Sequence, residues 1–200
     1  QSIYNELKEW ANQVAITLQL TLPEQEVKLW LDEKYFGKIL SNILSNAIKY
    51  SNASSTIKLS VSVGNLNEVT PLYKNTFENT TRTLAGKQLI VKVEDEGVGL
   101  EKEALPEIFE RFHRVEGQGQ KRVGSGIGLS LVKSLVEAHR GGIIISSKPN
   151  VGTEVIITFP MDDSYLLPEQ KLQDSAFRLK EYLSDYAVEY EHLNDEEDEI

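Results

Sequence analysis

The 200-residue sequence has no cysteine, a single methionine and no long apolar run. Without cysteine the chain forms neither a disulfide nor a thiolate metal site, which fits a cytoplasmic location. A membrane-spanning helix needs about 20 consecutive apolar residues, and no stretch approaches that length. The chain opens at Gln1 without a signal-type pattern, so we expect it to be excised from a longer protein. The glycosylation sequons at Asn52 and Asn79 are then accidental matches.

Basic residues are scarce at the C-terminal end. Residues 161–200 hold 13 of the 31 acidic residues but only three of the 21 basic ones, which leaves 18 of each sign in residues 1–160. A neutral main part offers no electrostatic footprint for nucleic acid. We therefore expect one domain over residues 1–160, ending near Pro160, followed by an acidic, partly helical extension or linker over residues 161–200.

Apolar periodicity predicts the elements of the first 160 residues. Helical spacing indicates a helix over Ser2–Gln13, with Trp10 and Val14 on its apolar side, and a long helix capped by Asp32. Alternation predicts strands, the last two of which form a hairpin. These strands are Ala15–Leu22, Val27–Leu31, Thr56–Val63, Gln88–Val93, Ile143–Ser147 and Glu154–Phe159. Residues 64–87 are polar and longer than a hairpin needs, and we interpret them as a floppy inserted loop rather than a docking surface.

The end of the long helix carries the first candidate site. At 100° per residue one face is apolar and the opposite face gathers two carboxamides, a lysine and a tyrosine. The apolar face comprises Phe36, Ile39, Leu40, Ile43, Leu44 and Ala47, and the polar face comprises Asn42, Asn46, Lys49 and Tyr50. An Asn oxygen ligates Mg²⁺ without adding charge, and a lysine reaches the phosphates that the metal bridges. The alternative is a solvated helix face.

Two glycine-rich segments suit a flat ligand that carries phosphates. Asp95 ends a strand and precedes Gly97 and Gly99, which let the backbone turn closely around a ligand, although a plain Asp-Gly turn is the alternative. The run 124–129 opens a second helix, where free N–H groups bind phosphate oxygens. The apolar stripe of that helix is Leu131, Val132, Leu135, Val136 and Ala138. Gly141-Gly142 is expected to end it in the left-handed conformation. The spacing matches neither the common phosphate loop nor the dinucleotide fingerprint.

The C-terminal extension repeats apolar residues at spacings of four and three. The repeat consists of Leu172, Ala176, Leu179, Leu183, Tyr186, Tyr190 and Leu193. It predicts an amphipathic helix that packs on a partner or on its own domain. The acidic run 195–199 is expected to be disordered.

Five segments, taken in order, resemble the ATP-binding catalytic domain of bacterial sensor histidine kinases, in the superfamily that also holds gyrase, the heat-shock chaperone and mismatch-repair ATPases. The segments are Asn42–Tyr50, Asp95–Leu100, Glu107–Phe112, Gly124–Leu129 and Gly152–Thr153. The resemblance covers residues 1–160 and implies an α+β fold, a two-layer α/β sandwich of the Bergerat type. Its mixed, mainly antiparallel sheet is covered on one face by three helices. The box Glu107–Phe112, with Ile108, Phe109 and Phe112 as apolar anchors, borders an ATP lid over residues 113–125.

The same resemblance implies a role for each site residue. Asn46 holds Mg²⁺ with Asn42 close to the metal and the γ-phosphate, so that Asn42, Asn46 and Lys49 form the catalytic set. Asp95 accepts a hydrogen bond from the exocyclic amine of adenine, supported by Thr153, while Tyr50 walls the pocket. The remaining ATP contacts implied are Gly97, Gly99, Leu100, Arg114, Gly124, Ser125, Gly126, Ile127, Gly128 and Leu129.

The activity implied is that of an ATP-dependent protein-histidine kinase in two-component signal transduction. Its partners are the phosphoacceptor-histidine dimerisation module of the parent protein and the receiver domain of a response regulator. A helical acidic linker after the domain also fits a hybrid kinase. None of His113, His139 and His192 lies in the context of the acceptor, so we expect the chain to bind ATP without phosphorylating itself.

Three other functions stay open at this point. An ATP-hydrolysing conformational clamp uses a glutamate base where this chain has Asn42. A degenerate module would bind nucleotide only to regulate a partner, and a serine kinase of the anti-sigma type fits the box and lid less well. For the kinase domain we expect a cytoplasmic location, with no nucleic-acid partner and no direct membrane contact by this chain, although the parent protein can be anchored in the inner membrane.

Overall fold

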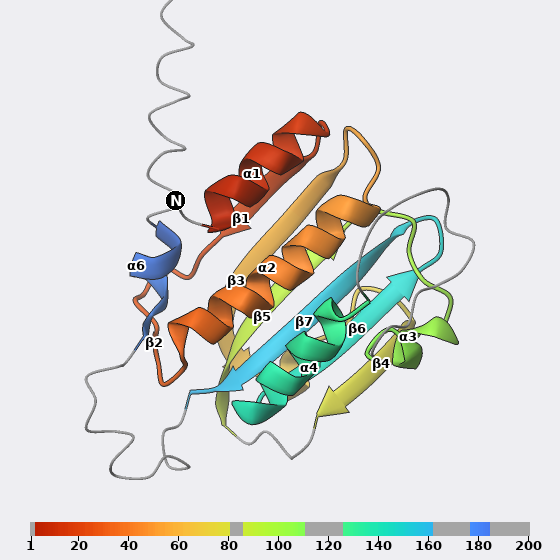
Figure 1. Ribbon diagram of the computed structural model, residues 1–200. Helices are drawn as coiled ribbons and strands as arrows, with labels where there is room; N and C mark the ends of the chain where they lie inside the picture. Colours follow the sequence, from red (N-terminus) through yellow and green to blue (C-terminus); the bar gives the residue numbers. More distant parts are fainter. Residues whose placement is uncertain (1–2, 81–85, 111–125, 162–176, 185–200) are drawn as a thin grey trace, which may run out of the picture.

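The computed structural model describes residues 3–80, 86–110, 126–161 and 177–184. A six-stranded sheet of order β1-β3-β5-β7-β6-β4 forms one layer (Figure 1). Its strands are β1 (Thr17–Thr21), β3 (Thr56–Asn65), β5 (Lys87–Asp95), β7 (Gly152–Pro160), β6 (Gly142–Lys148) and β4 (Asn75–Thr80). β1 runs parallel to β3, and the other neighbouring pairs are antiparallel. The mixed, mainly antiparallel sheet is therefore confirmed.

Helices α1 (Ile3–Gln13), α2 (Glu33–Tyr50) and α4 (Gly128–Ala138) form the second layer and cover one face of the sheet (Figure 1). α2 begins where predicted, because the Asp32 carboxylate accepts from the backbone N–H groups of Lys34 at 2.8 Å and Tyr35 at 3.4 Å. α3 (Ala104–Glu107) is a single turn beside β4. Among the described helices none is long and apolar enough to cross a membrane. The α/β sandwich predicted from the sequence is confirmed.

The core lies between the two layers. All six residues of the predicted apolar face of α2 are buried there, from Phe36 to Ala47. They pack against the helix-facing residues of the central strands, which include Ile57, Leu59, Leu89, Val91, Ile157 and Phe159. Burying one such aliphatic or aromatic side chain stabilises the fold by about 1.5–3 kcal/mol. The polar face of α2 is thereby turned away from the sheet.

The prediction for α4 is wrong in two details. Val132 and Val136 are buried, but Leu131 is 38% exposed and Ala138 is exposed too. The helix ends in a left-handed residue as expected, but this residue is Arg140 with φ 56°, not a glycine. The N–H of Gly141 donates to the Val136 carbonyl at 2.9 Å, which completes the C-terminal motif. Gly141 is needed for a different reason: a β-carbon there would lie 2.8 Å from Val136 Cγ1.

The interpretation of residues 64–87 as a floppy loop is also wrong for the described part of that segment. It contains the 3₁₀ turn η1 (Leu66–Glu68) and strand β4, which pairs with β6 at the edge of the sheet. Phe77 of β4 stacks against Phe109 with ring centroids 5.5 Å apart. Main-chain pairing and this aromatic contact order a stretch whose polar composition suggests a loop.

The described part of the C-terminal extension packs on its own domain, one of the two predicted alternatives. β8 (Phe177–Arg178) pairs with β2 (Lys28–Leu29), and α6 (Leu179–Ser184) follows. Leu179 and Leu183 are buried, whereas Leu172, Ala176, Tyr186, Tyr190 and Leu193 lie outside the described residues. β7 ends at Pro160. The division at this residue into domain and extension stays a prediction.

Candidate functional site

The polar face of α2 meets the start of α4. Asn42, Asn46, Lys49 and Tyr50 are all half-buried. The Asn42 amide donates through Nδ2 to the Lys38 carbonyl at 2.7 Å, which turns Oδ1 toward α4. A β-carbon on Gly128 would lie only 2.7 Å from this oxygen. The structure therefore brings together two segments that are more than 80 positions apart in the sequence.

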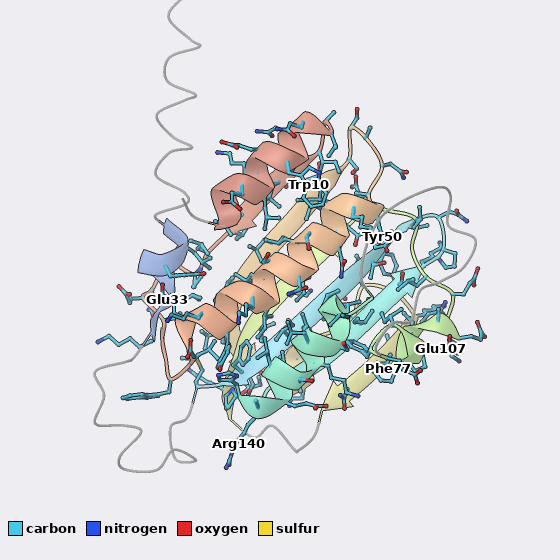
Figure 2. All side chains as sticks on the ribbon, in the orientation of Figure 1. Trp10, Glu33, Tyr50, Phe77, Glu107 and Arg140 are labelled. Carbon is cyan, nitrogen blue, oxygen red and sulfur yellow. The ribbon has the colours of Figure 1, made fainter. Side chains whose placement is uncertain are left out.

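Lys49 and Tyr50 are the last two residues of α2, and Figure 2 labels Tyr50 at this end of the helix. The Lys49 ammonium sits 5.0 Å from the centre of the Tyr50 ring, within the range of a cation–π contact. This contact is worth about 0.5–1 kcal/mol at an exposed site. It places a positive charge at the end of the helix whose earlier turns carry Asn42 and Asn46.

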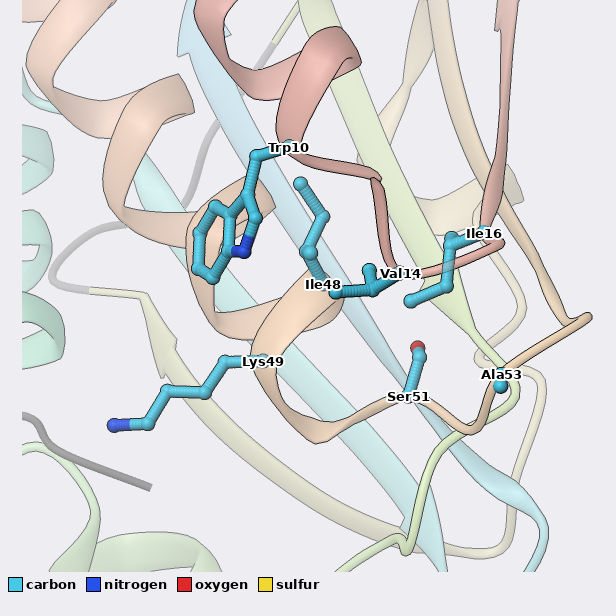
Figure 3. A pocket seen from close by; sticks show the side chains of 7 residues that line it. All are labelled: Trp10, Val14, Ile16, Ile48, Lys49, Ser51 and Ala53. Carbon is cyan, nitrogen blue, oxygen red and sulfur yellow. The ribbon is translucent and has the colours of Figure 1, made fainter. Parts of the chain in front are cut away.

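A pocket of about 410 Å³ lies on the other side of Lys49, between α1 and the end of α2 (Figure 3). Its lining residues are Trp10, Val14, Ile16, Ile48, Lys49, Ser51 and Ala53. Lys49 contributes its aliphatic stem, and its ammonium points away (Figure 3). Trp10 and Val14 are 37% and 39% exposed, so the apolar side predicted for α1 is only partly buried. No residue of β5 or α4 lines this pocket, which is therefore distinct from the site at the glycine segments.

Asp95 ends β5 and is fixed by two backbone donors. Its Oδ1 accepts from the N–H of Gly97 at 2.9 Å and of Thr153 at 3.2 Å. Its Oδ2 has no hydrogen-bond partner within the part of the chain that the structure describes. Burial raises the pKa of Asp95 from 3.8 to about 6, although the two N–H groups act in the opposite direction. At neutral pH the group is an anchored carboxylate with one oxygen left to accept from a ligand.

The loop 97–99 joins Asp95 to the end of α2. The N–H of Val98 donates to the Tyr50 carbonyl at 3.2 Å, and Ser51 bridges to Gly97. A side chain on Gly97 would collide with the Tyr50 carbonyl oxygen. The glycine is therefore required for close approach to the Tyr50 main chain, whereas the predicted close approach to a ligand stays a prediction. The loop holds Asp95 and Tyr50 in one rigid corner.

The β6–β7 turn completes this corner. Ser147 Oγ accepts from the Leu100 N–H at 2.8 Å and lies 2.9 Å from Thr153 Oγ1. The N–H of Asn150 donates to the Val98 carbonyl at 2.7 Å. Sequence reasoning missed Ser147, and its only signal was a serine at the end of the apolar run 143–145.

The remaining predicted residues divide into two groups. Gly126, Ile127, Gly128 and Leu129 lie at the start of α4, where Gly126 has a φ of 68°. Arg114, Gly124, Ser125 and the predicted lid 113–125 lie outside the described residues, as do Phe112, His113 and His192. Phe109 is buried and Ile108 half-buried, which confirms both as apolar anchors. His139 lies 2.7 Å from the Leu135 carbonyl through Nδ1 and stacks on Tyr35 and Phe159, a packing role.

The polar groups of the site suit a metal ion that takes most of its ligands from water and substrate phosphates. Searching the described ranges yields no group of three or more His, Cys, Asp or Glu side chains that could hold a metal ion. What the site offers is the neutral amide oxygens of Asn42 and Asn46 on one helix face. This set fits Mg²⁺, which keeps several waters and takes other ligands from substrate phosphates.

Comparison with known proteins decides the family. A family model described as "Histidine kinase-, DNA gyrase B-, and HSP90-like ATPase" matches residues 31–163. The chain belongs to this family. The resemblance noted in the sequence is thus confirmed, and the corner described above belongs to an ATP-binding catalytic domain of the histidine kinase type.

Two curated relatives are sensor kinases of greater length. Sensor histidine kinase WalK of Bacillus subtilis (strain 168) is 31% identical over 140 residues, which is 70% of this chain and 20% of WalK. Histidine kinase P4 of Formosa agariphila is 26% identical over 197 residues, which is 96% of this chain and 13% of P4. The chain therefore spans a fifth or less of these relatives.

Solved structures share the fold. The full-length ShkA structure in complex with AMPPNP matches with a TM-score of 0.59 at 21% identity, over 79% of this chain and 28% of that chain. The catalytic domain of histidine kinase ThkA matches with a TM-score of 0.58 at 21% identity, over 80% of this chain and 88% of that domain. The predicted Bergerat-type fold is confirmed.

Proposed function

We propose that this domain binds Mg-ATP and acts as an ATP-dependent protein-histidine kinase of a two-component system. The observation that carries the proposal is the anchored Asp95, with Oδ1 held by two N–H groups and Oδ2 left for a ligand. The exocyclic amine of adenine is a donor that this oxygen would accept. A guanine presents a carbonyl at the same ring position and would place two acceptors against each other.

The other predicted residues would hold the triphosphate. Asn46, with Asn42 beside it, would bind Mg²⁺, and Lys49 would contact phosphate. The backbone N–H groups at the start of α4, next to Gly128, would receive phosphate oxygens. Bound Mg²⁺ supplies charge neutralisation on the triphosphate. Tyr50 would form a wall of the nucleotide pocket.

The transfer itself needs position and charge rather than a protein nucleophile. The bond from the γ-phosphorus to the β–γ bridging oxygen breaks, a bond to an imidazole nitrogen forms, and ADP leaves. The imidazole would belong to a dimerisation module of the parent protein, and the phosphoryl group would then pass to the receiver domain of a response regulator. Use of ATP and the lack of cysteine support a cytoplasmic location.

Asn42 favours transfer over hydrolysis. An amide is no general base, and its Nδ2 already donates to the Lys38 carbonyl at 2.7 Å. We therefore expect steady-state ATP hydrolysis by the isolated chain to stay near background. Rapid turnover would favour the conformational-clamp alternative, and it is measured by phosphate release.

Calorimetric titration with a non-hydrolysable ATP analogue, with and without Mg²⁺, tests the proposal. Wild type should bind saturably, and Asp95→Ala should abolish binding. Glu101→Ala is the matched control, because this acid follows the same loop and is exposed. The absence of binding by a folded wild-type chain would contradict the proposal.

The histidine module, supplied in trans, tests the kinase step. We expect acid-labile, alkali-stable phosphate on the module and none on the chain itself. Such phosphate on the chain alone would contradict the prediction that it lacks its acceptor. In the full-length protein, Asn46→Ala should abolish signalling, whereas a degenerate regulatory module would signal unchanged.

A further inference from the structure

The connection between β3 and β4 crosses the sheet on the face opposite the helices. Three strands separate β3 from β4 in the sheet, so the connecting segment has to pass over them. Its Leu66 and Val69 pack on Ile90, Ile144 and Ile156, which form an apolar cluster separate from the main core. Residues 66–74, which we call the strap, therefore lie over the far face.

A buried carboxylate fastens the strap. Glu154 of β7 is fully buried, and its Oε2 accepts from the Leu72 N–H at 2.8 Å and from Ser146 Oγ at 2.9 Å. Its Oε1 pairs with Lys92 Nζ at 2.9 Å. The N–H of Tyr73 donates to the same Ser146 Oγ at 3.2 Å. A buried charge is tolerated only with such partners, so the main chain at residues 72–73 is held tightly on the sheet.

This anchor lies next to the Asp95 corner. Glu154 follows Thr153, whose N–H donates to Asp95 Oδ1. The Tyr73 hydroxyl lies 3.0 Å from the place of a β-carbon on Gly152, and that β-carbon would also collide with the Asp95 carbonyl oxygen. The Tyr73 hydroxyl thus lies beside the Gly152–Thr153 backbone, and the N–H of Thr153 is one of the two donors to Asp95.

The environment of Tyr73 raises its pKa further above neutral pH. Burial raises the pKa of Tyr73, and the carboxylates of Asp95, Glu94, Glu154 and Glu96 raise it further. A neutral hydroxyl adds no charge to the corner. Tyr73 can therefore act there by packing or by hydrogen bonding, but not as a charge.

We infer that the strap is a positioning element of the nucleotide site, in which Tyr73 holds the Gly152–Thr153 backbone so that Asp95 keeps its free oxygen toward the base. The inference rests on the proposed function, in which Asp95 binds adenine. Tyr73 is a positioning residue, because it would touch neither nucleotide nor metal. Asn42, Asn46 and Lys49 lie on α2, on the opposite side of the sheet from the strap, so the strap acts on the base and not on the phosphates.

The test compares two ligands that differ only in the exocyclic amine: the imido triphosphate analogues of adenosine and of purine riboside. Their affinity ratio reports the hydrogen bond from the amine to Asp95. In Tyr73→Ala we expect weaker binding of the adenosine analogue by about tenfold, one hydrogen bond of typical strength, with the purine riboside analogue nearly unchanged. Leu72→Ala is the control, because this neighbouring side chain is 55% exposed and should leave the ratio at its wild-type value.

Each outcome decides one question. A ratio unchanged in Tyr73→Ala, or a proportional loss of both ligands, overturns the inference and leaves the proposed function standing. Failure of the wild-type chain to bind either analogue overturns the proposed function itself. Thermal denaturation checks that each variant is folded. If Tyr73→Ala does not fold, Tyr73→Phe removes only the hydroxyl beside Gly152 and should lower the ratio by a smaller factor.

Discussion

The ionised carboxylate of Asp95 lowers the stability of the folded domain. Burial raises its pKa from 3.8 to about 6, so the folded state holds the proton more tightly than the unfolded chain does. Ionised Asp95 therefore costs folding free energy. This cost is absent below pH 3.8, grows as pH rises to about 6, and is constant above that pH. The residue proposed to bind adenine therefore lowers the stability of the domain.

Asp95→Asn should therefore stabilise the domain at neutral pH. The amide oxygen still accepts from Gly97 and Thr153, while the charge is gone. A shift from 3.8 to about 6 corresponds to about 3 kcal/mol, and the new amide N–H₂ offsets part of it, so we expect a gain of about 1–2 kcal/mol at pH 7.5. Urea unfolding at pH 7.5 and pH 4 measures the difference, with Glu101→Gln as the exposed control. An equal effect at both pH values would contradict the burial argument.

Binding of adenine should strengthen with pH. The amine donor favours the charged carboxylate, so affinity should rise as pH passes through about 6 and then level off. The ratio of affinities for the adenosine and purine riboside analogues isolates the effect, because titration of the triphosphate cancels. A ratio that is flat between pH 5 and 8 would show that Asp95 does not titrate in this range.

At the scale of elements, the sequence pattern predicted those helix features that depend on neighbouring residues alone. The apolar face of α2 and its Asp32 cap follow from spacing and side-chain chemistry, and both are confirmed. β4 was missed, because five of its six residues are Asn, Thr or Glu, of which Asn and Glu have low strand propensity. Only its pairing with β6, some 65 positions away in the sequence, makes it a strand. The run Ile143–Ile145 is buried on both faces, a pattern that already predicts a covered far side.

Removing the cap of α2 should affect stability but not binding. Asp32→Ala removes the side-chain acceptor of the Lys34 N–H, while the Tyr35 N–H still donates to the Asp32 carbonyl at 3.0 Å, and should cost about 1 kcal/mol. The binding face lies at the other end of the helix, so nucleotide affinity of the folded variant should match wild type. Glu33→Ala, which changes only a first-turn charge, should cost less. Weakened binding at unchanged stability would show that the cap reaches the site.

At the scale of the whole molecule, the site depends on contacts that no single segment reveals. Asn42 and Asp95 were found from their own segments, with the family resemblance supplying their roles. Ser147, Glu154 and Tyr73 matter because strands distant in sequence bring them to the Asp95 corner. A polar residue in a strand pattern does not show by itself which partner it meets. Sequence reasoning therefore named Asn42, Asp95 and the Thr153 that holds Asp95, whose contacts with a ligand stay a prediction, and it missed Ser147, Glu154 and Tyr73.

The docked C-terminal segment explains a glycine inside α2. Gly37 lies in a helix interior, where glycine costs about 1 kcal/mol relative to alanine. A β-carbon at this position would lie 2.7 Å from the Tyr182 hydroxyl of α6. The Tyr182 ring also stacks on Phe36, with centroids 6.0 Å apart. The glycine thus makes room for the segment that follows the sheet.

The sign of Gly37→Ala should therefore depend on Tyr182. In wild type the new methyl group displaces the tyrosine, so we expect no gain or a loss of stability. In a Tyr182→Ala background the obstacle is gone, and the same change should stabilise the chain by up to about 1 kcal/mol through helix propensity. Urea unfolding of wild type, the two single variants and the double variant gives the four free energies of unfolding that this double-mutant cycle needs. Equal stabilisation by Gly37→Ala in both backgrounds would mean that α6 does not pack on α2 in solution. A stability change that is negative in wild type and positive in the Tyr182→Ala background would show that the extension packs on the helix that carries Asn42 and Asn46.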